Sequence, residues 1–259
     1  MLKENRLKQK ITAGQLAYGI FCSVPSPALI ELIAEANYDF VIIDTEHVLI
    51  NPETIENMIR TAESYQLTPL VRVADANPKT MLRLLDGGAQ GIVLPMVESA
   101  ADIQQAIQAC KYYPTGNRSL NAGRPGAFGK ISLTDYVTKA NQEIMLIAMI
   151  ESTKGIENIE KIATVSGLDM ILEGAADLSQ SLGIPWQTSH SNVQIALHHC
   201  HKAVAKAGVP YCAIPRESHD HNKWLEKGVT TFVLGDDRGT AFRALQSKID
   251  SVKQKRKEQ

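Results

Sequence analysis

The stretch Phe40-Val-Ile-Ile-Asp-Thr-Glu-His47 joins an uninterrupted apolar run to two carboxylates and an imidazole. A strand that is buried on both faces reads as a short continuous apolar run. In parallel α/β folds, chemistry gathers at the carboxyl ends of such strands. The stretch therefore predicts a buried parallel strand over 40–44 that delivers Asp44, Glu46 and His47 to an active site. Capping of the next helix by the two carboxylates is the alternative.

The same alternation of apolar runs and helical periodicity continues along the whole chain. Strands are expected at 16–22, 40–44, 70–73, 91–94, 145–150, 170–172, 210–214 and 231–234. Helices are expected at 28–36, from 52 onward, and at 79–86, 100–111, 156–165, 193–207, 219–227 and 238–252. This pattern predicts one domain over residues 1–259, a (β/α)₈ or TIM barrel. A doubly wound open sheet is the alternative, but no glycine-rich dinucleotide turn follows the first strand.

Residues 112–143 interrupt this rhythm and are rich in glycine, proline and arginine. Connections longer than about 12–15 residues inside a compact domain are usually functional or mobile. We interpret the segment either as a loop over the active-site mouth or as a contact between subunits.

Charge and cysteine usage narrow the functional classes. The formal net charge of −1 gives no general attraction to nucleic acid or to a membrane surface. The four cysteines are far apart and lack the spacing of a zinc or disulfide framework, which fits a reducing compartment. The charged N-terminus has no apolar signal core, and no run approaches about 18 apolar residues. A cytoplasmic protein is expected.

Polar side chains follow several of the predicted strands, and a barrel would bring them to one mouth. They are Asp44, Glu46, His47, Arg72, Glu151, Glu173 and Asp177. Glu151 and Asp177 are one βα unit apart, so they would lie on neighbouring strands. Mg²⁺ is commonly held by one or two carboxylates, with water and substrate completing its coordination. Glu151 and Asp177 are therefore candidate metal ligands, with two unrelated helix caps as the alternative.

The remaining candidates supply positive charge, a base and anion-binding N–H groups. Arg72 would offer a guanidinium fork to a developing oxyanion or a carboxylate. His47 can act as a general base near neutral pH, and Asp86 or Asp44 could orient it. The backbone N–H groups of 174–176 (Gly174, Ala175 and Ala176) could face an anion such as a substrate carboxylate.

These motifs together resemble the HpcH/HpaI family of class II, metal-dependent aldolases over almost the whole chain. The matching pieces are Ser26-Pro27…Glu31, Asp44-Thr-Glu-His47, Val71-Arg-Val73, Leu85-Asp86…Gly91, Val93-Leu-Pro-Met-Val97, Tyr113-Pro-Thr-Gly-Asn-Arg118, Ile150-Glu151 and Gly174…Asp177-Leu-Ser…Ser181-Leu-Gly183. The resemblance implies a (β/α)₈ barrel whose C-terminal helices are exchanged between subunits of a homo-oligomer, often a hexamer. It also implies a divalent metal at Glu151 and Asp177 that chelates a 2-oxo acid, Arg72 at the oxyanion, and His47 paired with Asp86.

Four departures from the family pattern affect the substrate shell. Val48 replaces a glycine, Met149 replaces a glutamine that helps to hold the 2-oxo acid, and Ala175 replaces a proline. After Arg118, Ser119-Leu-Asn121 replaces a glycine-led turn. With these changes the chain resembles an offshoot of the family that makes citrate for siderophore biosynthesis. That resemblance implies condensation of acetyl-CoA with oxaloacetate, with Mg²⁺ or Mn²⁺ as the metal. An aldolase that cleaves a 4-hydroxy-2-oxo diacid to pyruvate and an aldehyde, and a non-catalytic scaffold, are the alternatives.

Arg118, Arg124 and Lys130 in the long connection are candidate contacts for coenzyme A.

Overall fold

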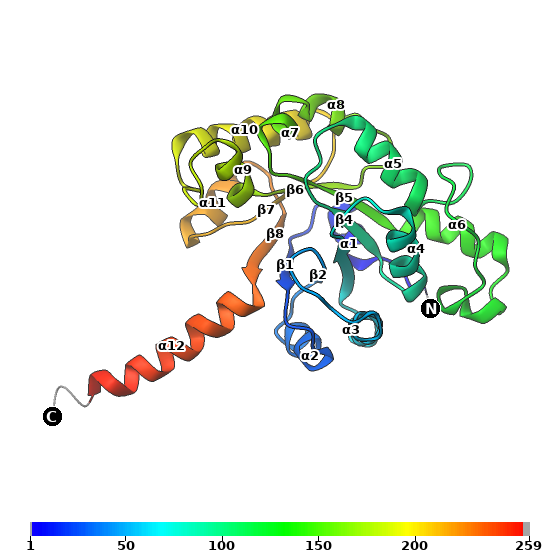
Figure 1. The fold of residues 1–259 in the computed structure, drawn as a ribbon, viewed down its shortest axis with the longest axis horizontal. Coiled ribbons are helices and arrows are strands. Elements are labelled where there is room, and N and C mark those ends of the chain that lie inside the picture. The colour runs from blue at the N-terminus through cyan, green and yellow to red at the C-terminus, as the bar shows by residue number, and fades with distance from the viewer. Residues whose placement is uncertain (1, 256–259) are drawn as a thin grey trace.

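The computed structural model describes residues 2–255 as a closed barrel of eight parallel strands surrounded by helices (Figure 1). The strands follow one another around the barrel in chain order, and β8 closes it by pairing in parallel with β1. They are β1 (Ala17–Cys22), β2 (Phe40–Asp44), β3 (Thr68–Arg72), β4 (Gly91–Leu94), β5 (Met145–Ile150), β6 (Met170–Glu173), β7 (Tyr211–Ala213) and β8 (Thr231–Asp236). The (β/α)₈ prediction is confirmed.

Between and around the strands lie the helices, most of which run back along the outside of the barrel. They are α1 (Arg6–Thr12), α2 (Pro27–Glu35), α3 (Pro52–Ser64), α4 (Pro78–Gly87), α5 (Ala100–Cys110), η1 (Arg124–Gly129), α6 (Leu133–Glu143), α7 (Thr153–Glu157), α8 (Ile159–Ala163), α9 (Ala175–Ser181), α10 (Ser191–Lys206), α11 (Ser218–Glu226) and α12 (Asp237–Lys255). A proline opens each of α2, α3 and α4, where its missing N–H has no intrahelical partner to lose.

Strand β2 shows why the apolar runs are continuous, because all five of its residues are buried. Phe40 and Ile42 point into the barrel interior, whereas Val41 and Ile43 pack against the surrounding helices. Each strand thus separates an inner core from an outer one, and both faces need apolar side chains.

The amino-terminal end of the barrel is closed by α1, which the sequence analysis did not predict. Leu7 is fully buried among the interior side chains, and its backbone N–H donates to Oγ1 of Thr68 at 3.2 Å. The short amphipathic stretch is mostly charged, so its apolar contribution comes from very few positions. Because α1 covers the amino-terminal end of the strands, their carboxyl-terminal end is the open face of the barrel.

The segment 112–143 differs from its prediction in two ways. It contains η1 and α6, since Tyr136 and Ala140 recur at helical spacing and are buried. It also connects the end of α5 to the start of β5, so it lies at the amino-terminal end of the strands, away from the mouth. The prediction of a loop over the active site is therefore wrong, and the subunit-contact interpretation stays a prediction.

Two of the three candidate coenzyme contacts in this segment, Arg118 and Arg124, form ion pairs with other residues. Arg118 forms an ion pair with Asp86 at 2.6 Å and stacks over the ring of Tyr112. Arg124 forms an ion pair with Glu63. Both arginines brace the amino-terminal end of the barrel rather than its mouth.

Helix α12 leaves the barrel after β8 and extends away from it (Figure 1). Its apolar side chains, among them Phe242 and Leu245, are exposed in this chain. Exchange of this helix between subunits stays a prediction. Within residues 2–255, no helix has the length and apolar content needed to span a membrane.

Candidate active site

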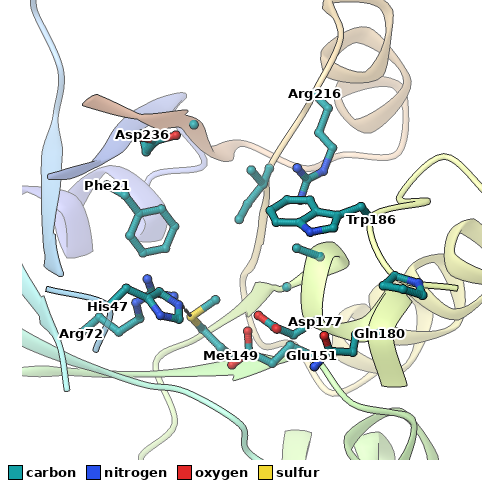
Figure 2. Close-up of a pocket in the computed structure, with 15 residues that line it drawn as sticks. Phe21, His47, Arg72, Met149, Glu151, Asp177, Gln180, Trp186, Arg216 and Asp236 are labelled. Carbon is teal, nitrogen blue, oxygen red and sulfur yellow. Dashed lines mark hydrogen bonds between the residues drawn. The ribbon is translucent and has the colours of Figure 1, made fainter. Parts of the chain in front are cut away.

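A cavity of about 350 Å³ opens at the carboxyl ends of the barrel strands. Figure 2 shows that its walls combine charged, aromatic and aliphatic side chains from separate parts of the chain. The lining residues are Phe21, His47, Arg72, Met149, Glu151, Gly174, Ala176, Asp177, Gln180, Pro185, Trp186, Ile214, Arg216, Gly235 and Asp236. The barrel has thus brought most of the predicted site residues into one place.

Arg72 is held rigidly at the floor of this cavity by Asp44. Its Nε donates to Oδ1 of Asp44 at 3.0 Å, and its Nη2 donates to Oδ2 at 2.8 Å. Both residues end adjacent strands and are paired in register, which makes this two-bond contact geometrically natural. Burial raises the pKa of Asp44, but hydrogen bonds and the charge of Arg72 outweigh it and hold that pKa below its ordinary value. Arg72 therefore presents a fixed, desolvated positive charge.

The side chain of Arg72 is completed by three other neighbours. Its Cζ lies 4.6 Å from the ring centroid of Phe21, and its Nη1 lies 3.8 Å from Sδ of Met149. Nη1 is also 3.2 Å from Oε2 of Glu46. Met149 thus enters the site as predicted, but as an apolar wall against the arginine.

His47 projects into the mouth of the cavity from the turn after β2. Its side chain is 55% exposed, and its nearest carboxylate is Glu46, with Nε2 3.8 Å from Oε2. From this turn, Asp44 accepts the backbone N–H groups of Glu46 and His47, and no hydrogen bond joins it to the imidazole among the described residues. The prediction that Asp44 orients the imidazole is therefore wrong, because both oxygens of Asp44 serve Arg72 and the backbone.

Glu46 is the carboxylate that links the arginine to the histidine. Its Oε2 is buried and, despite the ion pair with Arg72, has no hydrogen-bond partner among the described residues. Burial raises the pKa of Glu46, with the charge of Arg72 opposing that shift. An acceptor oxygen of this kind can receive a hydrogen bond from a bound water or substrate.

Glu151 lies at the end of β5 and shares the cavity with Asp177 from α9 (Figure 2). Its Oε1 accepts the backbone N–H of Met96 at 2.7 Å. Burial, reinforced by the negative charges of Glu46 and Asp177, raises the pKa of Glu151 to about 7, although the Met96 N–H favours the ionised form. Glu151, Asp177 and Glu46 thus lie near one another, and the positive charge of Arg72 does not neutralise all three.

This arrangement fits a divalent cation. Among residues 2–255, no group of three or more His, Cys, Asp and Glu side chains is placed to hold a metal. Two carboxylates remain, Glu151 and Asp177, both exposed to the cavity. Oxygen ligands that leave several coordination positions for water and substrate suit Mg²⁺. These two residues would hold the ion.

Gly174 is required by the position of Glu151. A Cβ at residue 174 would lie 2.5 Å from Oε2 of Glu151 and would overlap the Cβ of Glu151 as well. The absence of a side chain is therefore what lets the metal-site carboxylate lie against the turn after β6.

We expect Gly174→Ala to displace the Glu151 carboxylate and to weaken divalent-metal binding by about 10- to 100-fold, the range typical of groups that orient metal ligands. Isothermal titration with Mn²⁺ measures this. Gly87→Ala is the matched control, because Gly87 lies in α4 and a Cβ there would meet no atom closer than 3.9 Å. Equal Mn²⁺ affinities for wild type and Gly174→Ala would contradict the steric argument.

The backbone N–H groups of 174–176 were expected to face an anion. In the structure these three residues differ in hydrogen bonding and in exposure to the cavity. The N–H of Gly174 donates to the carbonyl of Ile150 at 3.1 Å, so it is not available. Ala175 is buried in the outer core, while Gly174 and Ala176 line the cavity. The prediction is wrong for Gly174, whose N–H is already bonded to the end of β5, and it stays a prediction for Ala175 and Ala176.

Asp86 and Glu173 lie outside the cavity. Asp86 ends α4 at the opposite end of the barrel, where it accepts hydrogen bonds from Arg118 and from Nδ2 of Asn121. Within one chain Asp86 therefore does not orient His47, because a helix returns the chain to the amino-terminal end of the strands. Glu173 faces the helices and binds the Tyr211 hydroxyl at 2.7 Å.

Several lining residues were not anticipated, namely Phe21, Gln180, Pro185, Trp186, Ile214, Arg216, Gly235 and Asp236. Arg216 and Asp236 could have been predicted from the sequence. Each lies at or just after the end of a strand, as the predicted site residues do. Trp186 could not, because its place depends on the loop that follows α9.

Comparison with known proteins places these observations in a family. The family model for HpcH/HpaI aldolase/citrate lyase matches residues 17–244. The chain is 30% identical to the 5-keto-4-deoxy-D-glucarate aldolase of Klebsiella pneumoniae over 250 residues, 96% of this chain and 97% of that protein.

Two solved structures share the whole architecture. The crystal structure of citrate synthase SbnG is 46% identical, covers 96% of this chain and 98% of its own, and has a TM-score of 0.90. The HpcH/HpaI aldolase from Desulfitobacterium hafniense DCB-2 is 28% identical, covers 95% and 96%, and has a TM-score of 0.92. On the match over most of its length, the chain belongs to the HpcH/HpaI aldolase/citrate lyase family.

Proposed function

We propose that the protein is a metal-dependent citrate synthase that condenses acetyl-CoA with oxaloacetate and supplies citrate to siderophore (staphyloferrin B) biosynthesis. The observation that carries this proposal is the 46% identity to citrate synthase SbnG over 96% of the chain. The site supports it, since Met149 gives an apolar contact at a position where the family's aldolases are expected to hold the 2-oxo acid with an amide.

The chemistry can be assigned to residues of the cavity. Glu151 and Asp177 would hold Mg²⁺, or Mn²⁺ in its place, and the ion would polarise the keto group of a chelated 2-oxo acid. His47, at the open mouth, would take a proton from the methyl group of acetyl-CoA. The resulting carbon attacks the keto carbon of oxaloacetate, and a new C–C bond forms as the keto oxygen becomes an alkoxide.

Arg72 would stabilise this alkoxide. Its guanidinium is fixed by Asp44 before substrate binds, so little reorganisation is needed as charge develops. The proton held by His47 passes to the alkoxide, which becomes the hydroxyl of the product. A water molecule then cleaves the thioester, which releases citrate and free CoA. The net reaction consumes one water and yields one thiol for each citrate.

Other features of the proposal follow from the family. We propose a homo-oligomer, by family analogy a hexamer, in which α12 packs on a neighbouring subunit. We also propose a cytoplasmic enzyme with no nucleic-acid or membrane partner. Cys22, Cys110, Cys200 and Cys212 are buried and unpaired, as a reducing environment would leave them.

The test is release of free CoA thiol. We expect thiol only when acetyl-CoA, oxaloacetate and Mg²⁺ are all present, and we expect EDTA to abolish it and excess Mg²⁺ to restore it. The product is identified as citrate by mass spectrometry. Purified protein that releases no thiol above a no-enzyme control under these conditions would refute the proposal.

The second candidate function is a class II aldolase that cleaves a 4-hydroxy-2-oxo diacid to pyruvate and an aldehyde. The 30% identity to a 5-keto-4-deoxy-D-glucarate aldolase over 96% of the chain favours it. A lactate dehydrogenase assay for pyruvate, run with 5-keto-4-deoxy-D-glucarate, distinguishes it from citrate formation.

A further inference from the structure

The cavity contains two arginines with different surroundings. Arg72 has Asp44 and Glu46 as ionic partners. Arg216 makes no hydrogen bond or ion pair with another residue of the described chain. Its charge acts on Glu173, but the oxygens of that carboxylate are already bonded to Tyr211 and to the backbone N–H of Ile214. Arg216 thus retains its donors for a ligand.

Arg216 is well placed to contact a ligand held at the metal site. It follows β7, which pairs with β6, and β6 leads directly to Gly174 and Asp177. Neighbouring strands lie about 5 Å apart, and an arginine side chain spans a similar distance. Figure 2 shows Arg216 and Trp186 on one side of the cavity, with Glu151 and Asp177 on the other.

We propose that Arg216 binds the carboxylate of a dicarboxylic 2-oxo acid that lies farthest from the metal site, and so selects diacids over monoacids. This inference rests on the proposed function for its substrate, oxaloacetate. The first carboxylate and the keto oxygen of that substrate are assigned to the ion at Glu151 and Asp177. The second carboxylate must also leave water, which is unfavourable unless it is paired. A guanidinium fork matches a carboxylate with two hydrogen bonds.

The phosphates of coenzyme A are a less suitable partner for Arg216. A long pantetheine arm separates them from the acetyl group. The acetyl group must reach the keto carbon beside Arg72 and the metal site, so the phosphates lie far from that point. Arg216 lines the same cavity as Arg72 and Glu151, as a partner of the second oxaloacetate carboxylate must.

The test measures binding as well as turnover. We expect Arg216→Met to weaken Mg²⁺-dependent binding of oxaloacetate by about 10- to 100-fold, the effect of losing hydrogen bonds between charged groups. Pyruvate, which lacks the second carboxylate, should bind wild type and Arg216→Met equally. Arg216→Lys should fall between the two because it keeps the charge without the fork.

Titration calorimetry gives these dissociation constants, and Trp186 offers a second signal. Its indole is 80% exposed beside Arg216, whereas Trp224, the other tryptophan of the chain, is buried. Lys223→Met is the matched control, since Lys223 pairs with Asp220 outside this cavity. This control should bind oxaloacetate as wild type does, and thermal unfolding should show all three variants folded.

Three outcomes would overturn the inference. They are an unchanged oxaloacetate affinity in Arg216→Met, an equal loss of pyruvate affinity, and a rise confined to the KM for acetyl-CoA. Failure of the proposed function would give a different result. If wild type makes no citrate while Arg216→Met still loses oxaloacetate affinity selectively, citrate synthesis is refuted and the diacid site stands.

Discussion

Asp177→Asn and Glu151→Gln are each expected to lower metal-dependent citrate formation by more than about 100-fold. Loss of a group that merely orients a metal ligand typically lowers activity or metal affinity by about 10- to 100-fold, and loss of a ligand should exceed that. Each change replaces a carboxylate by an amide of the same shape, so the cavity keeps its volume. Titration with Mn²⁺ should show much weaker binding in both variants, in parallel with the loss of thiol release.

Glu98→Gln serves as the control for these two variants. Glu98 also follows a barrel strand, but its carboxylate pairs with Ser152 and Lys154 outside the cavity. It should bind Mn²⁺ as wild type does. The assignment fails if Asp177→Asn retains wild-type Mn²⁺ affinity, or if all three variants lose activity equally.

The Arg72→Met substitution should reduce both catalysis and stability. Removing one donor to a developing oxyanion typically lowers kcat by about 10²- to 10³-fold. The change also leaves Asp44 buried without its counter-ion, and breaking a buried pair from one side typically destabilises a protein by about 3–5 kcal/mol. Thiol-release kinetics and urea unfolding measure the two effects separately.

The double variant Asp44→Asn/Arg72→Met separates catalysis from folding. With the buried carboxylate neutralised, we expect most of the lost unfolding free energy to return while kcat stays low. Arg72→Lys should keep part of the activity because it retains the charge but cannot form both hydrogen bonds to Asp44. Activity returning together with stability in the double variant would assign Arg72 to folding alone.

Asp44 and Asp86 show which contacts can be predicted from the sequence and which cannot. Both were candidate partners of His47, and both lie near other polar residues in the chain. Asp44 lies in register beside Arg72, so pairing of β2 with β3 commits it to the arginine. Asp86 ends a helix and is carried to the other end of the barrel, where Arg118 neutralises it. Strand register and helix direction determine these contacts. Neither can be read from the residues next to Asp44 or Asp86 in the chain.

The residues that line the site divide in a similar way. Glu151, Asp177, Arg72 and His47 could be identified from their place after apolar runs, because the carboxyl ends of parallel strands meet at one mouth. Trp186 could not, since its position depends on a loop. Arg216 follows the same rule as the predicted residues, but only the three-dimensional structure shows that it has no hydrogen bond or ion pair to another residue of 2–255.

The sequence by itself determined the fold and the end of the barrel at which the candidate site lies. Each strand is buried on both faces and therefore needs apolar side chains at consecutive positions. Such a run can be recognised from neighbouring residues alone. The tertiary structure alone decided which charges neutralise one another. Arg72 forms ion pairs with Asp44 and Glu46, burial raises the pKa of Glu151 to about 7, and Arg216 lines the cavity with no ion pair among the described residues. Electrostatic partners depend on distances across strands, and only the closed barrel sets those distances.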